Sequence, residues 1–336
     1  MSLPRIHVLA GALVARDGRV LVAQRPPGKH LAGGWEFPGG KRDAGESRID
    51  ALARELAEEL GVRLEAARPL IRFTHEYPDR IVDLDVWRVD RWQGDPRGLD
   101  GQAIAWCAIG DLDRQGLLPA DRPIVTALDL PPMVAITGGA ETQANEASSG
   151  HEPVDRSLAD ALAGRAETLV AAGAGVVQLR IPVLDPGRLS EVAREVAPRC
   201  RAAGGRLVVN GLDSRLLDLL SAGLIDGLHI PARFLETLAG MDRPAGLIGA
   251  SCHSPRELAR AAAAGADYVF LSPVRPTRSH PGAEPLGWEQ FAAWVAPVRM
   301  PVYALGGLGP RDLKAAWDAG AQGVAGIRGF GSSRSR

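Results

Sequence analysis

Eight short apolar segments after residue 132 constrain the fold more than any other feature of the sequence. They alternate with Ala- and Leu-rich stretches of helical pattern, several of which end at glycine, a residue that readily adopts positive φ. The apolar segments are Met133–Thr137, Val176–Leu179, Leu207–Val209, Gly227–Ile230, Leu247–Ala250, Tyr268–Leu271, Val302–Leu305 and Gly323–Ile327. The helical patterns include Leu189–Ala197, Arg215–Ala222, Pro255–Ala264 and Pro310–Ala319. Eight strand–helix repeats predict a closed (β/α)8 barrel, and a doubly wound open sheet is the competing arrangement.

The residues before this repeat have a different pattern. Up to about Leu130 the sequence indicates mixed strands with one strongly marked helix, and two prolines follow directly. We therefore expect two α/β domains, residues 1–130 and residues 131–330, the second being compact for a barrel. Within the second domain, residues 138–153 are polar and rich in Gly, Ser and Glu, which predicts a long loop.

Composition excludes several classes of partner. The formal net charge is -1, from 39 basic and 40 acidic residues, so no overall field attracts a nucleic acid polymer or an acidic membrane. No apolar run approaches the ~18 residues that span a bilayer. The three cysteines, Cys107, Cys200 and Cys252, form no CxxC motif and are typical of a reducing cytosol. These features predict a cytoplasmic protein that binds its anionic ligands at local sites.

Two apolar runs near the start of the chain, Val8–Ala15 and Val20–Ala23, lie on either side of an Asp-Gly pair. This pattern predicts a β-hairpin. A signal peptide is the alternative, but its cleavage would remove a strand that the following sheet needs.

A glycine-rich loop leads into a helix that carries three carboxylates on one face. The helix is predicted to begin after Ser47 and to end at Gly61. Glu55, Glu58 and Glu59 stand at i, i+3 and i+4, where like charges repel each other. A hard divalent cation, Mg²⁺ or Mn²⁺, compensates such a cluster, whereas a solvated acidic helix face is the commoner meaning of clustered glutamates.

The spacing of the whole segment resembles the signature of the Nudix hydrolase family. That signature is Gly, five residues, Glu, seven residues, Arg-Glu, an apolar residue, any residue, Glu-Glu, any residue, Gly and an apolar residue. The matching positions are Gly40, Glu46, Arg54, Glu55, Leu56, Glu58, Glu59, Gly61 and Val62. The resemblance implies an α/β/α sandwich with a mixed sheet. It also implies that the three helix glutamates hold Mg²⁺ or Mn²⁺ together with the carbonyl of Gly39, and that Glu46 pairs with Arg54 to brace the loop.

The rest of the first domain is similar to the MutT branch of that family, whose members remove oxidised guanine nucleotides. Trp35–Gly40 is similar to the approach to the signature in that branch, and Glu76–Arg80 to a base-pocket segment. The residues that the resemblance places at the nucleotide are Arg25, Phe37, Arg80 and Asp121. It implies hydrolysis of 8-oxo-dGTP or a related nucleoside triphosphate to a monophosphate and pyrophosphate.

Two positions depart from the MutT pattern. Ala105 stands where that branch carries a further metal-ligand Glu, and Asp121 stands where it places a purine-reading Asn. A carboxylate accepts from N–H donors, and a protonated carboxyl donates to a carbonyl. Asp121 is therefore either a base-recognition residue or an ordinary loop residue.

The second domain resembles the thiamine-phosphate synthase and TenI family. The residues that carry this resemblance follow the C-terminal ends of the predicted strands, where barrels keep their active sites. They are Gln178, Arg180, Asn210, His253, Thr277, Gly306 and Gly307. The implied ligand is a thiazole phosphate or a thiamine phosphate, with a glycine-rich loop presenting backbone N–H groups to the phosphate.

Several groups of the synthase pattern are replaced. Pro182 stands where the family has a pyrophosphate-binding Lys, and Gly211 stands where it has a metal-ligand Asp. The second such Asp is absent from His229–Phe234, and the phosphate loop has become Thr277–His280. Condensation with a departing pyrophosphate is electrostatically unsupported without these groups.

Three functional hypotheses follow. The leading one is a Mg²⁺-dependent Nudix pyrophosphohydrolase that carries a degenerate synthase-like barrel. The second is a thiamine-pathway enzyme, a synthase or a thiazole tautomerase with His253 as its acid/base, whose Nudix domain clears thiamine phosphates. In the third, the barrel is a ligand-binding regulator and His253 a structural histidine at its rim.

Overall fold

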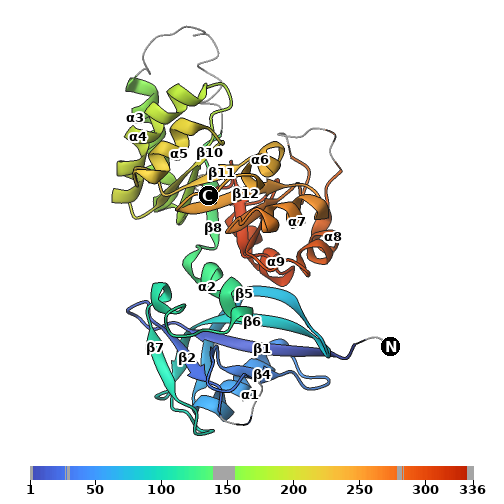
Figure 1. Cartoon of the computed structure of the whole chain (residues 1–336). Helices are drawn as coiled ribbons and strands as arrows, with labels where there is room; N and C mark the ends of the chain where they lie inside the picture. Colours follow the sequence, from blue (N-terminus) through green and yellow to red (C-terminus); the bar gives the residue numbers. More distant parts are fainter. Residues whose placement is uncertain are drawn as a thin grey trace, which may run out of the picture. The chain divides into compact units, whose positions relative to one another are not determined.

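The computed structural model describes residues 3–26, 28, 31–138, 156–277, 282 and 284–330. The chain forms two compact units, one made largely of residues up to Leu130 and the other largely of residues from Pro131 onward (Figure 1). Apart from Gly138, the predicted polar loop at 138–153 lies outside the described residues. In the described part of the chain, no helix has the length and apolar character needed to cross a membrane.

The first unit contains two small sheets. The mixed sheet has the order β4-β1-β6-β5, in which β1 runs parallel to β6 and antiparallel to β4. Its strands are β1 (Arg5–Leu13), β4 (Gly39–Lys41), β5 (Arg63–Tyr77) and β6 (Arg80–Gln93). The second sheet has the order β3-β2-β7 and is antiparallel. Its strands are β2 (Val20–Gln24), β3 (Trp35–Glu36) and β7 (Ile104–Cys107).

A helix packs on each side of the mixed sheet, because successive side chains of β1 point to opposite faces. Leu13 belongs to the apolar cluster that buries one face of α1 (Arg48–Leu60). Its neighbour Ala12 belongs to a second cluster, which buries α2 (Arg122–Asp129). The predicted α/β/α sandwich with a mixed sheet is confirmed (Figure 1).

Of the hairpin predicted at the start of the chain, the structure contains the turn but not the paired strands. Gly18 has a φ of 82°, and the Asp17 carboxylate accepts a hydrogen bond from the Arg19 N–H at 3.1 Å. Beyond a single bridge between Val14 and Val20, the two runs separate into different sheets. The prediction of a paired hairpin was wrong, because β1 pairs with β4 and β6 whereas β2 pairs with β3 and β7.

The second unit is a closed barrel of eight parallel strands in sequence order, from β8 to β15 and back to β8. The strands are β8 (Met133–Ile136), β9 (Val176–Leu179), β10 (Arg206–Asn210), β11 (Gly227–Ile230), β12 (Leu247–Cys252), β13 (Tyr268–Leu271), β14 (Val302–Leu305) and β15 (Gly323–Gly326). Each coincides with a predicted apolar segment to within two residues. The predicted (β/α)8 barrel is confirmed, and the open sheet is excluded.

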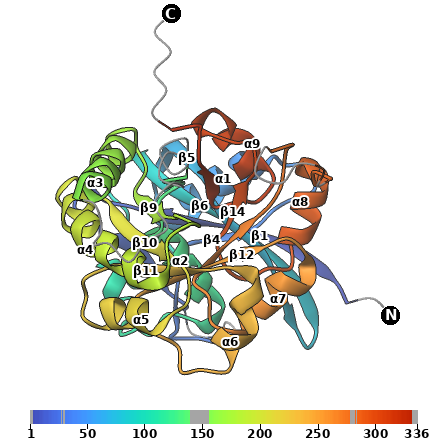
Figure 2. The same cartoon turned by 90° about the horizontal axis from the view of Figure 1, so that it is seen from above.

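Helices surround the barrel on its outside, as the view from above shows (Figure 2). They are α3 (Arg156–Ala171), α4 (Pro186–Ala202), α5 (Ser214–Ser221), α6 (Leu235–Ala239), α7 (Pro255–Ala263), α8 (Gly287–Val295) and α9 (Leu313–Asp318). Inside the barrel the rings of Tyr268 and Tyr303 meet edge to face at 5.6 Å, and Phe270 lies 5.5 Å from Tyr268. The centre is therefore a packed core, and a ligand has room only at an end of the barrel.

Candidate functional sites

The loop before α1 is pressed against the carboxylates of that helix. The backbone N–H of Gly39 donates to Glu59 Oε2 at 2.9 Å. A Cβ at Gly40 would lie 2.3 Å from Glu55 Oε2, and a Cβ at Gly39 would lie 2.1 Å from the carbonyl oxygen of Leu9. Gly39 also has a φ of 146°, a conformation that favours glycine. Two glycines are thus required for the loop to approach α1 this closely.

Arg54 is the cation that holds the loop and the helix together. Its Nε and Nη2 each lie 3.0 Å from an oxygen of Glu46, so the pairing expected for these two residues is present. Its Nη1 donates to Glu55 at 2.9 Å and to Glu58 at 3.3 Å. Hydrogen bonds from Arg54 hold the pKa of Glu46 below its ordinary value, and those carboxylates raise the pKa of Arg54. Part of the repulsion among the helix carboxylates is therefore compensated within the protein.

The donor chemistry of this segment suits a hard divalent cation. Glu55, Glu58, Glu59 and the Gly39 carbonyl offer oxygen ligands only, the set that Mg²⁺ and Mn²⁺ prefer. The Glu58 side chain is 60% exposed and the Glu55 side chain only 14%. Across the described ranges, no three His, Cys, Asp or Glu side chains already converge in a metal-binding arrangement. The residue types fit a divalent metal, and the carboxylates must turn from their present partners to bind one together.

A second cluster of charged side chains joins β3 to the start of α2. Arg25 Nε lies 3.0 Å from Glu36 Oε1. Asp121, the last residue of the 3-10 turn Pro119–Asp121, is 8% exposed. Burial, with a smaller contribution from the negative charge of Glu36, raises the pKa of Asp121 to about 7. Asp121 is thus a buried carboxyl poised to change its protonation state near neutral pH, unlike an ordinary loop residue.

The other two residues expected at the nucleotide are placed differently. The Phe37 side chain is 4% exposed and belongs to the core cluster under α2, so it presents no ring surface for stacking. The backbone N–H of Phe37 donates a hydrogen bond to the Asp121 carboxyl. Arg80 begins β6, pairs with Asp79 at 3.0 Å and lies over the Tyr77 ring. In the described residues, no hydrogen bond or ion pair links Arg80 to the cluster of Arg25, Glu36 and Asp121.

Glu36 was not among the residues expected at the site. The available signal was a carboxylate between two aromatic residues in a short strand directly before the glycine loop. A charged side chain in such an apolar setting needs a partner, and Arg25 supplies it.

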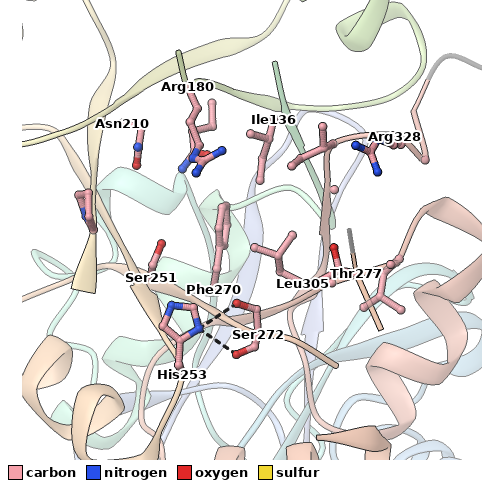
Figure 3. Close-up of a pocket in the computed structure, with 18 of the residues that line it drawn as sticks. Ile136, Arg180, Asn210, Ser251, His253, Phe270, Ser272, Thr277, Leu305 and Arg328 are labelled. Carbon is pink, nitrogen blue, oxygen red and sulfur yellow. Dashed lines mark hydrogen bonds between the residues drawn. The ribbon is translucent and has the colours of Figure 1, made fainter. Parts of the chain in front are cut away.

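In the second unit, a cavity of about 590 Å³ opens at the C-terminal ends of the barrel strands (Figure 3). All seven residues expected there line this cavity: Gln178, Arg180, Asn210, His253, Thr277, Gly306 and Gly307. They come from five different strands or the loops that follow them. The rule that barrel sites lie at C-terminal strand ends was sufficient to bring them together.

His253 is oriented by Ser272 across the cavity wall. Its Nδ1 lies 3.0 Å from the Ser272 carbonyl oxygen and 3.2 Å from Ser272 Oγ (Figure 3). Because a carbonyl oxygen only accepts, Nδ1 carries the hydrogen, and in the neutral ring Nε2 is then the proton acceptor. The geometry fixes a tautomer suited to proton transfer.

A second histidine, His229, lies fully buried beneath the cavity. Its Nε2 is 2.9 Å from Ser251 Oγ, and the centre of its ring lies 4.2 Å from that of Phe270, which lines the cavity. Burial lowers the pKa of His229 to about 3, and the charge of Arg180 acts in the same direction. His229 is therefore neutral at physiological pH and serves to hold Ser251 and the cavity floor in place.

The same two units emerge when the chain is compared with known families. Residues 9–127 match the family model described as NUDIX domain, and residues 153–330, more than half of the chain, match the one described as Thiamine monophosphate synthase. The chain belongs to both families. The glycine loop with α1 is the signature segment of its NUDIX domain, and the barrel is its thiamine monophosphate synthase domain.

Individual relatives cover one domain each. The NUDIX domain is 39% identical to CTP pyrophosphohydrolase of Escherichia coli (strain K12) over 122 residues, 36% of this chain and 90% of the relative. It is 32% identical to 8-oxo-dGTP diphosphatase of the same organism over 124 residues, 37% of this chain and 96% of the relative. The synthase-family domain is 38% identical to a putative thiamine-phosphate synthase of Geobacter sulfurreducens over 165 residues, 47% of this chain and 74% of the relative.

Two arginines of the synthase-family domain were also missed by sequence reasoning. Arg233 and Arg328 line the cavity together with Arg180. Each follows a predicted strand by a few residues, so the position of a basic residue just after a strand was the available signal.

Proposed function

We propose that the NUDIX domain is a divalent-metal-dependent pyrophosphohydrolase that converts a nucleoside triphosphate to a monophosphate and pyrophosphate. The main support is the contact of Gly39 and Gly40 with Glu59 and Glu55, which holds the glycine loop against the carboxylates of α1. Nudix hydrolases act on phosphoric anhydrides, and two relatives are named for CTP and for 8-oxo-dGTP. We propose 8-oxo-dGTP or a related oxidised nucleotide as the substrate.

In this proposal Glu55, Glu58 and Glu59 hold Mg²⁺ or Mn²⁺ with the Gly39 carbonyl. The metal supplies neutralisation of phosphate charge and a lowered pKa for water. Arg54 keeps loop and helix in register through Glu46, so that the helix carboxylates stay beside the loop. One glutamate of the cluster accepts the proton of the attacking water.

Recognition of the base falls to the cluster of Arg25, Glu36 and Asp121. A carboxyl with a pKa near 7 exists in both forms at neutral pH, so Asp121 can donate to a base carbonyl or accept from a base N–H. An 8-oxo purine offers both kinds of group on one edge. We propose that Asp121 reads this edge, with the backbone of Phe37 helping to hold the carboxyl in place.

A substrate panel on the full chain with Mg²⁺ tests this proposal. We expect 8-oxo-dGTP to be hydrolysed with a higher kcat/KM than dGTP, CTP or thiamine diphosphate, and pyrophosphate to be released. Glu58→Gln is expected to lower kcat at least 100-fold, with little change in thermal stability because Glu58 is largely exposed. Glu65→Gln, a change to an exposed carboxylate on β5, is the matched control. Equal activity of the Glu58 variant and the control on every nucleotide would refute the metal assignment.

For the barrel we propose a ligand-binding domain that does not catalyse the synthase condensation. The positions where the resembling synthases carry metal-ligand carboxylates are occupied by Gly211 and by the segment around Arg233. A proton-transfer reaction on a thiazole phosphate needs neither metal nor pyrophosphate, and the tautomer fixed at His253 suits it. Formation of a thiamine phosphate by the full chain would contradict the first statement. Loss of a measured tautomerisation in His253→Ala would support the second.

A further inference from the structure

Three guanidinium groups line the barrel cavity with no acidic partner among the described residues. The described residues that form its wall include Arg180, Arg233 and Arg328 but neither Asp nor Glu. No ion pair joins any of the three to a carboxylate in the described ranges. Elsewhere in the same unit, Arg199, Arg201 and Arg243 each pair with a carboxylate at 3.0 Å or less. The cavity is thus a local concentration of uncompensated positive charge.

The topology of the barrel brings these side chains together. Arg180 follows β9 and Arg328 follows β15, and both strands are neighbours of β8 in the closed sheet. Figure 3 shows the two arginines on either side of Ile136, the last residue of β8. Arg233 follows β11. Burial lowers the pKa of the half-buried Arg180, and the positive charge of Arg233 acts in the same direction. Mutual repulsion of this kind is relieved when an anion binds between the groups.

Arg233 also lies where the resembling synthases have a metal-binding segment. The stretch from His229 to Phe234 lacks the expected carboxylate, and Ala232 and Arg233 of that stretch line the cavity. A carboxylate there would bind a divalent cation, which in turn would contact the phosphates. A guanidinium contacts the phosphate oxygens with its own positive charge. A guanidinium also donates two parallel N–H hydrogen bonds to phosphate oxygens, whereas a metal-binding carboxylate has no N–H to donate.

We propose that this cavity binds a ligand with two linked phosphate groups without a divalent metal, and that Arg233 and Arg328 take the metal's place. A single phosphate carries about -1.5 to -2 charges at neutral pH, which leaves one of three guanidinium groups unmatched. A second phosphate removes that mismatch. Phe270 offers an apolar surface for an organic group attached to the diphosphate, and Gly306 and Gly307, both with positive φ, bring the backbone of the next loop to the cavity.

Calorimetric titration of the full chain with inorganic pyrophosphate in EDTA tests the proposal. We expect one pyrophosphate per chain, an affinity at least tenfold higher than for inorganic phosphate, and weaker binding at higher salt. Arg233→Gln and Arg328→Gln should each weaken binding about tenfold, since each removes charge-assisted hydrogen bonds. Arg194→Gln, an exposed change in the middle of α4, should leave the affinity unchanged.

Further variants distinguish a loss of charge from a loss of folding, and binding in the barrel from binding in the NUDIX domain. Arg233→Lys should recover part of the lost affinity because it keeps the charge. Glu58→Gln should bind pyrophosphate as the wild type does, which assigns the heat to the barrel and keeps this test independent of the hydrolase. Competition by thiamine diphosphate and by guanosine diphosphate shows whether the organic group attached to the diphosphate resembles thiamine or a nucleoside. The proposal fails if pyrophosphate binds only with Mg²⁺, if phosphate binds equally well, or if both Gln variants retain wild-type affinity.

Discussion

Glu59 accepts a hydrogen bond from the backbone N–H of Gly39 at 2.9 Å, which ties the last turn of α1 to the loop on its N-terminal side. The two residues are 20 positions apart, and most of the helix Arg48–Leu60 lies between them in sequence. One face of that helix is fixed in the core by Leu52, Leu56 and Leu60, all fully buried. The packing of α1 therefore sets where the carboxylates stand relative to the loop.

Gly40→Ala tests whether the close approach of the loop is needed for turnover. The added Cβ would lie 2.3 Å from Glu55 Oε2, so the carboxylate or the loop must move. We expect kcat to fall about 100-fold, because displacement of a metal-binding group by 1 Å is costly in an active site. Gly110→Ala meets no atom within 4 Å and serves as the control. Wild-type kcat in the Gly40 variant would mean that Glu55 is not held against the loop during the reaction.

Glu46→Gln probes the bidentate pair with Arg54 through its pH dependence. The pKa of Glu46 is depressed in the folded protein, so its stabilising effect is present above the ordinary pKa of 4.5 and is lost as pH falls through the folded value. We expect the difference in free energy of unfolding between wild type and variant to be constant near neutral pH and to vanish in acid. Urea denaturation at several pH values measures it. A difference that persists unchanged in acid would assign the effect to packing instead of charge.

The sequence was most informative where a local pattern and the fold require the same residues. The eight barrel strands are short buried runs, and the segment from Ser47 to Gly61 contains both the caps and the apolar face of α1. The seven barrel residues line one cavity because every parallel strand ends at the same face.

Sequence reasoning was less successful where the partner of a group is distant in the chain. The runs around Asp17 and Gly18 have the composition of a hairpin, but only tertiary pairing shows that they enter two sheets. Phe37 was expected at the nucleotide because of the resemblance to the MutT branch, and its burial depends on α2, more than 80 residues later. Arg328 reaches the cavity only because β15 pairs with β8 and closes the barrel.

Asp121→Asn is expected to change both stability and substrate choice near neutral pH. Because the pKa of Asp121 is raised to about 7, the folded protein holds this proton more tightly than the unfolded chain does. Stability from this group is therefore present at low pH and declines as pH rises from about 4 to about 7, by on the order of 4 kcal/mol at most. The Asn variant lacks that part of the pH dependence, and thermal denaturation between these pH values measures the difference.

The same substitution tests the role of Asp121 in base recognition. We expect the ratio of kcat/KM for 8-oxo-dGTP to that for CTP to change with pH around 7 in the wild type and to become flat in Asp121→Asn. A carboxyl that merely fills space would affect both nucleotides alike, so an unchanged ratio at every pH would remove Asp121 from the recognition site. Asp95→Asn, the same change at an exposed position, is the control because it leaves the cluster of Arg25, Glu36 and Asp121 intact. Thr74→Val is unsuitable, because the Thr74 hydroxyl donates a hydrogen bond to Asp83.

Removal of divalent metal should abolish the proposed activity of one domain and leave ligand binding by the other unchanged. In the proposed reaction, hydrolysis depends on carboxylates that need a cation, whereas the barrel cavity presents guanidinium groups that need none. In EDTA we expect nucleotide hydrolysis to stop while pyrophosphate still binds and raises the thermal midpoint, since a ligand that binds only the folded state stabilises it. Restoring Mg²⁺ should recover hydrolysis in the wild type and in Arg233→Gln alike, because that change lies in the barrel. Hydrolysis that survives complete metal removal would contradict the assignment of Glu55, Glu58 and Glu59, and loss of the stabilisation in EDTA would contradict that of Arg233 and Arg328.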